Sequence, residues 1–336
     1  MELAELNTWM SENQLRGYWT TPRQEGARGP QASYKPYIWR WKDVAHALDN
    51  AAELISSADS FRRFVGFVHP ELDNGSPSHT ITLGAQLVKP GERPAAHRHS
   101  LAALRFVVQG GGAATIVNGE AFPMEPGDLI TTPSNSWHEH INESDKPIIW
   151  LDSLDGPLIR FLQVGSGEPC HTEFQDVVRP VGMSAIEGGP IRPAWAQDPG
   201  PQPAPYRYAW QDTRHILDML AEEPGDPHDG IIVHYRNPRT GGWTLPSIAC
   251  GMQMLRPGET LQDHRHTSTT IYHAFQGSGR TVIDGQVFEW EAGDSFVVPL
   301  WCTHHHENPS QASAYLFSLS DRPVTEAFGL YREEPA

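Results

Sequence analysis

The chain repeats itself at about half of its length. Residues 87–142 read LVKPGERPAAHRHSLAALRFVVQGGGAATIVNGEAFPMEPGDLITTPSNSWHEHIN, and residues 254–308 read MLRPGETLQDHRHTSTTIYHAFQGSGRTVIDGQVFEWEAGDSFVVPLWCTHHHEN. A Pro-Gly-Glu turn, a His-Arg-His triplet, a Gly-Asp pair and a closing histidine occur in both stretches in the same order. A repeat of this length predicts a duplicated domain rather than a solenoid.

Short β-rich runs lie inside each copy and are separated by turn residues. The runs LRFVVQ, ATIV and DLITT alternate with Pro-Gly, Gly-Gly and Asn-Gly pairs. This punctuation is typical of hairpins in a barrel or sandwich. We therefore expect an all-β fold with two tandem β-barrel or jelly-roll domains.

The segments outside the two copies have a different composition. Helical spacing appears in TWMSENQLRGYW and DVAHALDNAAELISSA near the start, and in TRHILDMLAEE between the copies. Proline and glycine are concentrated in DPGPQPAPY, which predicts a linker along the surface. The expected organisation is a helical arm at 1–65, a catalytic barrel at 66–164, a linker at 165–230, a structural or secondary metal-binding barrel at 231–322 and a C-terminal tail at 323–336.

Composition limits the classes of partner. The 336 residues suit two domains, and 38% apolar residues are enough for a substantial core. A formal charge of −16 opposes binding to nucleic acid, so an anionic small substrate would need a local basic pocket. The start lacks a signal-peptide pattern and no apolar run approaches the roughly 18 residues of a membrane span, so we expect a cytoplasmic protein without membrane contact. Three cysteines without C-x-x-C spacing indicate neither a disulfide framework nor a thiolate zinc site.

Histidines at matched positions predict a metal site. Alternate residues of a strand share one face, so His97 and His99 can both point into a barrel and meet His138 from a later strand. Neutral imidazoles suit iron, copper, zinc or nickel. A single His-x-His is more often an accident of surface or core, but the same pattern recurs in the second copy. That second triad is His264, His266 and His304.

These motifs resemble those of the bicupins. The cupin patterns G-x5-H-x-H and P-x4-H-x3-N occur from Gly91 to His99 and from Pro133 to Asn142. Many cupins add a glutamate ligand shortly after the His-x-His, whereas residues 100–105 and 267–272 contain no carboxylate. Three neutral ligands leave coordination positions open and the charge of a dication uncompensated, which suits an anionic bidentate substrate together with dioxygen.

The resemblance narrows to the gentisate 1,2-dioxygenase family, which includes salicylate and 1-hydroxy-2-naphthoate dioxygenases. The stretches YIWRW, FRRFVGFVHP, AAHRHSLAALRFVVQG, GDLITTPSNSWHEH and WLDSLDGPLI are similar to stretches of that family in the same order, over almost the whole chain. The resemblance implies iron(II) as the cofactor, and a small aromatic hydroxy acid and O2 as substrates. It also implies ring opening between the carboxyl-bearing and hydroxyl-bearing carbons, which converts gentisate to maleylpyruvate, and a homotetramer.

The resemblance also assigns roles to residues of the first copy. It makes His97, His99 and His138 the iron ligands, and Arg105 the residue that grips the substrate carboxylate. Arg105 lies an even number of residues beyond His97 and His99, which predicts the same inward face, and a guanidinium fork matches a carboxylate. The resemblance makes His140 the histidine that hydrogen-bonds the substrate hydroxyl. An imidazole there could accept the phenolic proton, or it could support a metal ligand through a hydrogen bond.

Further pocket residues follow from the same resemblance. Gln86, Asp152 and one of the pair Arg62 and Arg63 match positions that line the pocket, and a structural salt bridge explains the arginines about equally well. The second copy has Tyr272 in place of Arg105 and Ser318 in place of Asp152. We therefore expect the second triad either to bind metal without turnover or to serve the structure alone.

Two departures from the family bear on the substrate. Many members have tryptophans where this chain has Thr82 and Asn135-Ser136, and small polar groups there should enlarge or rewet the pocket. A 5-substituted salicylate or 1-hydroxy-2-naphthoate is therefore an alternative to gentisate, although Asp152 suits a second ring hydroxyl. Two more distant alternatives are a metallocupin that is not a dioxygenase, such as a decarboxylase or isomerase, and a non-catalytic binding cupin.

Overall fold

The computed structural model describes residues 2–21, 29–56, 62–189, 191–195 and 203–336. The chain divides into two compact units, residues 1–31 and residues 32–336. The first unit contains the helix α1 (Leu3–Glu12) and the short 3-10 helix η1 (Tyr18–Thr20). They overlap the two ends of the first predicted helical stretch, 8–19, whose middle is not helical. No helix in the described part of the chain has the length and apolar character needed to cross a membrane.

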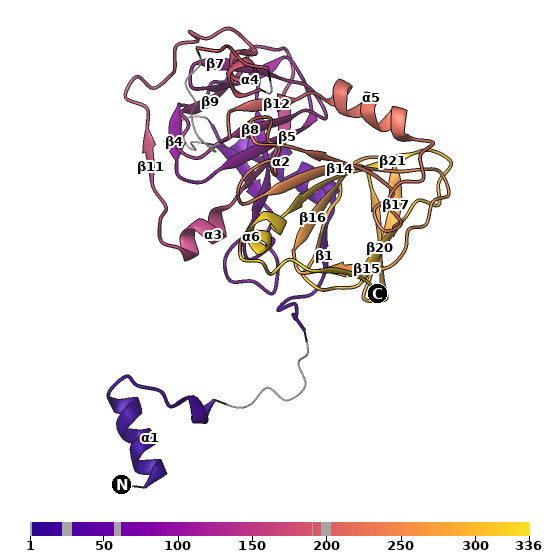
Figure 1. The fold of residues 1–336 in the computed structure, drawn as a ribbon. Helices are drawn as coiled ribbons and strands as arrows, with labels where there is room; N and C mark the ends of the chain where they lie inside the picture. Colours follow the sequence, from indigo (N-terminus) through magenta and orange to yellow (C-terminus); the bar gives the residue numbers. More distant parts are fainter. Residues whose placement is uncertain (1, 22–28, 57–61, 190, 196–202) are drawn as a thin grey trace. The chain divides into compact units, whose positions relative to one another are not determined.

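The second unit contains two β-barrels, which confirms the predicted all-β class with two tandem cupin-like domains (Figure 1). The strands of the first barrel are β2 (Arg63–Gly66), β3 (Thr82–Val88), β4 (His97–His99), β5 (Ala103–Gln109), β6 (Ala113–Val117), β7 (Glu120–Met124), β8 (Leu129–Thr132), β9 (His138–Asn142), β10 (Ile148–Leu154), β11 (Gly167–Pro169) and β12 (Tyr206–Tyr208). Those of the second barrel are β1 (Tyr37–Trp39), β13 (Ile231–Tyr235), β14 (Ala249–Leu255), β15 (His264–His266), β16 (Thr270–Gln276), β17 (Ser278–Ile283), β18 (Gln286–Glu291), β19 (Ser295–Val298), β20 (His304–Glu307), β21 (Ala314–Ser320) and β22 (Glu333–Pro335).

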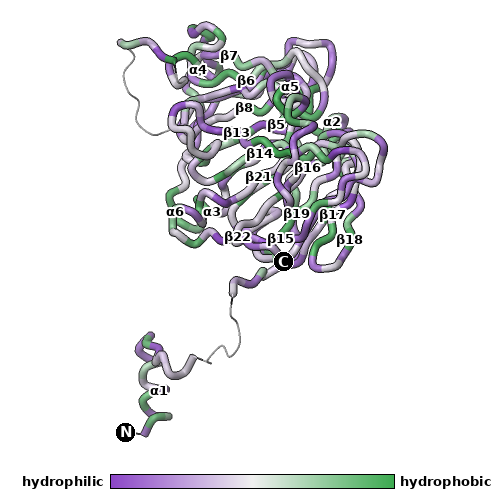
Figure 2. The backbone as a smooth tube through the Cα atoms, turned by 45° about the vertical axis from the view of Figure 1, so that its right-hand side comes forward, coloured by the Kyte–Doolittle hydropathy of each residue, from purple (hydrophilic) through white to green (hydrophobic). Residues whose placement is uncertain are grey.

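Each barrel consists of a six-stranded and a five-stranded sheet in the described residues. The strand order is β12-β8-β5-β10-β3-β2 and β11-β4-β9-β6-β7 in the first barrel, and β1-β19-β16-β21-β14-β13 and β18-β17-β20-β15-β22 in the second. The strands β3 and β14 are buried along almost their whole length and are mostly apolar, with one buried glutamine in each. Figure 2 shows these hydrophobic segments along the middle of the unit.

The two six-stranded sheets share one hydrophobic core. Phe106 of β5 stacks on Phe317 of β21, with ring centroids 4.1 Å apart and an interplanar angle of 6°. The same apolar cluster contains Leu83 and Leu151 from the first barrel and Met252 from the second. The two barrels therefore form one packed body rather than two separate domains joined by a linker.

Segments that precede each barrel are exchanged between the barrels. The strand β1 pairs with β19 of the second barrel, the helix α2 (Trp41–Leu54) follows, and β2 then pairs with β3 of the first barrel. In the same way β12 pairs with β8 of the first barrel, the helix α5 (Trp210–Leu220) follows, and β13 pairs with β14 of the second. The helices predicted at 43–58 and 213–223 are thus confirmed as α2 and α5. Residues 57–58 of the first stretch and 198–202 of the predicted linker lie outside the described residues.

The repeated Gly-Asp pair anchors these exchanged segments. The carboxylate of Asp128 accepts hydrogen bonds from the Trp210 backbone N–H at 2.9 Å and from Arg207 Nε at 2.7 Å. Asp294 accepts equivalent bonds from the Trp41 backbone N–H and from Arg40, both at 2.8 Å. Each aspartate therefore satisfies a free N–H group at the start of a helix and binds an arginine of the incoming segment.

Equivalent elements also follow the last long strand of each barrel. The helix α3 (Gly156–Phe161) and the strand β11 follow the first barrel, and the helix α6 (Arg322–Ala327) and the strand β22 follow the second. The strand β11 pairs with β4, and β22 pairs with β15. The short helix α4 (Met183–Gly188) lies beyond β11 in the sequence.

Replacing Asp128 with alanine should destabilise the protein. The change leaves the N–H group at the start of α5 and the Arg207 guanidinium without their acceptor, which we expect to lower the free energy of unfolding by about 1–3 kcal/mol. Urea denaturation of metal-free protein measures the effect. Asp145→Ala, at an exposed position, is the matched control and should stay within about 0.5 kcal/mol of wild type; equal effects of the two changes would contradict the anchoring role.

Candidate metal centre and substrate pocket

Three histidines converge inside the first barrel. His97 of β4 lies directly opposite His138 of β9 in the antiparallel register, and His99 shares the face of His97 on the same strand. The ring centroids of His97 and His138 are 4.2 Å apart, and those of His99 and His138 are 4.8 Å apart. One ligand nitrogen from each ring lies within 4.8 Å of the other two, so the three can reach one ion.

The hydrogen bonds of two of these rings fix which nitrogen faces the centre. The Nδ1 atom of His99 lies 2.8 Å from the backbone oxygen of Leu101, and that of His138 lies 2.9 Å from the backbone oxygen of Ser136. A backbone oxygen only accepts, so Nδ1 carries the proton and Nε2 keeps its lone pair. The buried Nε2 of His138 has no hydrogen-bond partner among the described residues. This donor set fits a metal ion.

Burial keeps these imidazoles in the neutral form that binds metals. Desolvation, together with the nearby guanidinium of Arg62, lowers the pKa of His97 to about 3. Burial also lowers the pKa of His99, and it lowers the pKa of His138 well below the ordinary value with help from the charge of Arg105. Metal binding at neutral pH therefore does not have to displace protons from the triad.

Arg105 lies fully buried beside the triad. Its Nη1 atom donates to Thr132 Oγ1 at 2.5 Å, and its Nε atom is 3.9 Å from Oδ1 of Asp152, the residue opposite it on β10. Burial lowers the pKa of the guanidinium, and Asp152 opposes that change. The even spacing from His97 does not explain this position, because the chain turns at 100–102 and β4 and β5 belong to different sheets. The register of β5 against β10 explains it instead.

The structure distinguishes the two neighbouring arginines. An Nη atom of Arg62 lies 3.0 Å from the His97 ring nitrogens, and its other Nη atom lies 3.5 Å from Oε1 of Gln86. Arg63 points away: its Nη1 atom donates to Glu92 at 2.6 Å and its Nε atom to the Ile55 backbone oxygen at 2.8 Å. Arg62 therefore belongs to the candidate site, and Arg63 forms a structural salt bridge.

Polar groups of the remaining predicted residues line the same interior. His140 lies two residues beyond His138 on β9, and Gln86 of β3 is paired with Trp150 of β10. In this interior several buried polar atoms lack a hydrogen-bond partner within the described residues. These atoms are Gln86 Nε2, Arg105 Nε, His138 Nε2, His140 Nε2, Trp150 Nε1 and Asp152 Oδ1. Buried polar atoms are normally satisfied, so this cluster indicates a site for a polar ligand.

Three residues of the site were not predicted from the sequence. Trp150 packs against His140 with centroids 4.7 Å apart, and its position two residues before Asp152 was a usable signal of an inward face. Thr132 lies opposite Ala103 in the pairing of β5 with β8 and accepts a hydrogen bond from Arg105, a contact that a sequence does not display. The Phe64 ring lies so close over Gly84 that a Cβ atom there would be 2.4 Å from it, which adds an apolar wall beside Asp152.

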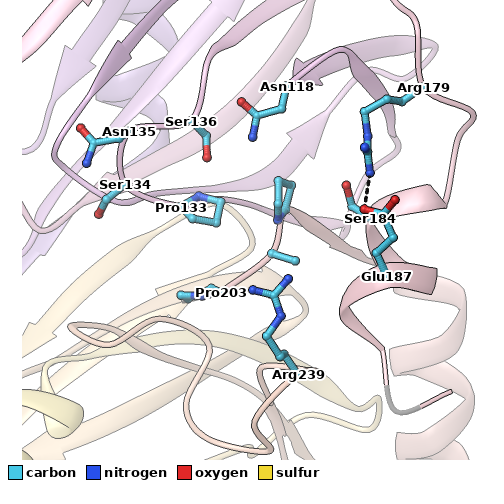
Figure 3. Close-up of a pocket in the computed structure, with 12 residues that line it drawn as sticks. Asn118, Pro133, Ser134, Asn135, Ser136, Arg179, Ser184, Glu187, Pro203 and Arg239 are labelled. Carbon is cyan, nitrogen blue, oxygen red and sulfur yellow. Dashed lines mark hydrogen bonds and ion pairs between the residues drawn. The ribbon is translucent and has the colours of Figure 1, made fainter. Parts of the chain in front are cut away.

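The triad reaches open space on one side. His99 and Asn135 line a cavity of about 410 Å³ between β4 and β11. Asn135 also lines a neighbouring pocket of about 630 Å³, where Figure 3 shows Asn118 and Ser136 together with Arg179 and Arg239. Arg179 is held there by Glu187 at 2.7 Å.

The second predicted triad also converges. Ligand atoms of His264, His266 and His304 lie within 4.8 Å of one another inside the second barrel. Tyr272 stands opposite Ser318 in the register that pairs Arg105 with Asp152 in the first barrel. The two barrels therefore repeat the histidines but not their surroundings.

Comparison with known proteins agrees with this architecture. The cupin domain model matches residues 84–154 and 251–320. The chain is 40% identical to 5-aminosalicylate 1,2-dioxygenase of Comamonas sp, which covers 99% of this chain and 90% of the relative. It is 39% identical to 1-hydroxy-2-naphthoate 1,2-dioxygenase of Nocardioides sp. strain KP7, over 97% and 86% of the two chains. Gentisate 1,2-dioxygenase 1 of Aquipseudomonas alcaligenes is 34% identical, over 99% and 96%.

A solved structure matches the whole fold. The salicylate 1,2-dioxygenase of Pseudaminobacter salicylatoxidans superposes with a TM-score of 0.90 at 30% identity, covering 99% of this chain and 97% of the other. That enzyme has also been solved as an adduct with gentisate.

The geometry predicts different effects of the two histidines on β9. His138→Ala should lower the metal content by one equivalent per chain, because His138 supplies one of the three converging nitrogens. His140→Ala should leave the metal content unchanged, since its ring lies 6.4 Å from that of His138, and His140 is not part of the triad. Elemental analysis after anaerobic metal loading and desalting measures both. An equal loss in the two variants would contradict the assignment of the triad.

Proposed function

The chain belongs to the gentisate 1,2-dioxygenase family of ring-cleaving dioxygenases, and we propose that it opens a 2-hydroxybenzoate ring at an iron(II) ion in the first barrel. O2 is inserted between the carboxyl-bearing and hydroxyl-bearing carbons, so gentisate would give maleylpyruvate. The observation that carries the assignment is the fully buried Arg105, whose Nε atom has no hydrogen-bond partner in the described chain and lies beside three neutral histidines. A buried guanidinium with free hydrogen-bonding capacity is suited to a carboxylate.

The ligands proposed for iron are His97, His99 and His138. Three imidazoles without a thiolate suit iron, as they suit copper, zinc or nickel, and they leave coordination positions open for other ligands. Iron(II) bound there supplies Lewis acidity and redox chemistry toward dioxygen. The protein supplies the binding and orientation of the substrate.

The charge around the triad supports an anionic substrate. Arg62 and Arg105 contribute two positive charges, and Asp152 contributes one negative charge. A bound dication would add further positive charge in a buried space. A substrate carboxylate on Arg105 would offset the charge of the bound ion, because buried positive charge needs a nearby anion.

His140 is placed to accept the phenolic proton. The Thr115 hydroxyl lies 3.0 Å from His140 Nδ1 and 3.2 Å from Met124 Sδ, so it can accept from an Nδ1–H group while its own hydrogen points to the sulfur; we propose this tautomer. The lone pair is then on Nε2, which has no partner among the described residues. Burial lowers the pKa of His140 well below the ordinary value, so the ring is neutral and its Nε2 atom can accept a hydrogen bond from the phenolic hydroxyl.

Asp152 favours a ring substituent that donates a hydrogen bond. Its Oδ1 atom is buried and without a hydrogen-bond partner in the described residues, so a hydroxyl or amino group could donate to it. Gentisate and 5-aminosalicylate both carry such a group, and the Comamonas relative is named for the latter. Thr82 is smaller than the tryptophan that many family members have at this position, which should leave room beside β3 for 5-substituted salicylates. A bicyclic hydroxynaphthoate remains the alternative, as does a binding cupin without turnover.

We propose a cytoplasmic homo-oligomer, with a tetramer as the family resemblance implies. An apolar pocket of about 490 Å³ lies between α3 and α6 and is lined by Phe161 and Phe328, which are 83% and 74% exposed. Exposed apolar surface of this kind is typical of a subunit contact.

The function is tested by loading the full chain with iron(II) anaerobically and adding air-saturated substrate. Oxygen-electrode and ultraviolet assays with gentisate, 5-aminosalicylate, salicylate and 1-hydroxy-2-naphthoate should show equimolar O2 uptake, fastest with acids that carry a donor at carbon 5. Protein that retains iron but consumes no oxygen with any of these acids would refute a dioxygenase. Fastest turnover of the naphthoate would instead refute the role of Asp152.

Arg105→Met should impair substrate capture while iron stays bound. Losing a charge-assisted contact of about 1.5–3 kcal/mol should lower kcat/KM roughly 10- to 150-fold, mainly through KM. Arg63→Met is the control, because Arg63 binds Glu92 and lies outside the pocket; it should lower stability and leave KM near the wild-type value. Steady-state kinetics with measured iron content separates these effects, and an unchanged KM in Arg105→Met would contradict the proposed role.

A further inference from the structure

The histidines of the second barrel are arranged as ligands of an ion. The Nε2 atoms of His264 and His304 lie 3.1 Å apart. Two nitrogen ligands about 2.1 Å from one metal are separated by about 3.0 Å at right angles and by about 3.4 Å at the tetrahedral angle. Two facing imidazole nitrogens at 3.1 Å need a proton or a cation between them, and the distance lies within the range that one ion allows.

The outer nitrogens of all three rings face an acceptor. His266 Nδ1 lies 2.9 Å from the Ser268 backbone oxygen, and His304 Nδ1 lies 3.1 Å from the Cys302 backbone oxygen. His264 Nδ1 lies 3.3 Å from Oε1 of Glu333. Such partners hold Nδ1 protonated and direct the Nε2 lone pair inward, which is the usual outer-shell arrangement of histidine metal sites.

The carboxylate of Glu333 comes from the C-terminal strand. The strand β22 pairs with β15 and places Glu333 directly opposite His266. Its Oε2 atom accepts a hydrogen bond from the Tyr331 hydroxyl at 2.7 Å and lies 3.9 Å from Arg322 Nη1. The carboxylate is thus oriented before any ion binds.

The first barrel has glycine at the equivalent position. Gly167 of β11 lies opposite His99, as Glu333 lies opposite His266. Where the second triad has a carboxylate, the first therefore has open space next to His99. This difference leaves the first triad accessible to an external ligand, whereas the second has a carboxylate of the protein beside it.

The charge and space around the second triad oppose a substrate. Asp229 has a carboxylate oxygen within 4.8 Å of the ligand atoms of His264 and Glu333, so two carboxylates lie beside His264. Tyr272, which is buried and stacked on Phe296, takes the place that Arg105 has in the first barrel. The cavity next to His266 is about 70 Å³, far below the roughly 300 Å³ of small-molecule sites.

We infer that the second barrel holds a structural divalent metal ion on His264, His266 and His304, with Glu333 orienting His264 and balancing the charge. The ion ties the C-terminal strand to the barrel, and it takes no part in turnover. This inference is independent of the proposed function, because it concerns other residues and a different readout.

Metal stoichiometry tests the inference. The full chain is loaded anaerobically with excess iron(II), and in a parallel series with zinc(II), then desalted and analysed for metal per chain. Wild type should bind two equivalents, His304→Ala one, and His138→Ala one, because the second site remains when the first is lost. Two remaining equivalents in His304→Ala, or one in wild type that only His138→Ala removes, would overturn the second site without affecting the proposed function.

A matched pair of glutamate variants tests the role of Glu333 even if His304→Ala fails to fold. Glu333→Gln should weaken the second equivalent about 10- to 100-fold in competition with a chromophoric chelator, as for other outer-shell partners. Glu334→Gln alters the adjacent residue, which binds Arg265 instead, and should leave the affinity unchanged. Equal affinities in the two variants would show that Glu333 forms only an ion pair with His264.

Discussion

The antiparallel contact between the His-x-His strand and the strand that carries the closing histidine is the constraint on which both sites depend. It places His97 opposite His138 in the first barrel and His264 opposite His304 in the second. The two strands belong to the same five-stranded sheet in each barrel, so the register between them fixes the distance between the rings. If one of the two strands slipped by one residue in this register, its histidines would point to the other face of the sheet.

Charge separates the two sites once the histidines are in place. Arg62 and Arg105 lie beside the first triad, so a dication bound there would stand next to positive side chains, as the proposed anionic substrate requires. Glu333 and Asp229 lie beside His264 of the second triad, so the protein itself balances the charge. The same fold thus carries a triad beside open space in one barrel and a triad beside carboxylates in the other. The duplication repeats the histidines, and the neighbouring side chains differ.

The exchange of segments between the barrels connects the site to the rest of the molecule. Arg62 immediately precedes β2, which follows the helix α2 and the strand β1 that is bound to the second barrel. A residue of the first site is therefore positioned by a segment anchored on the second barrel through Asp294. The shared core around Phe106 and Phe317 keeps this arrangement rigid, because interiors packed at this density do not deform gradually.

The sequence by itself determined the duplication, the all-β class, both histidine triads and the inward position of His140, because strand periodicity and repeated motifs are local properties. Arg105 was predicted from family resemblance. Its even spacing from His97 and His99 did not explain its position, because a turn separates β4 from β5 and the two strands belong to different sheets. Only the tertiary structure separated Arg62 from Arg63, paired Arg105 with Thr132, and brought Glu333 to His264 across 69 positions of the chain. These contacts depend on pairing between strands that are distant in sequence, and no local pattern records which strand lies next to which.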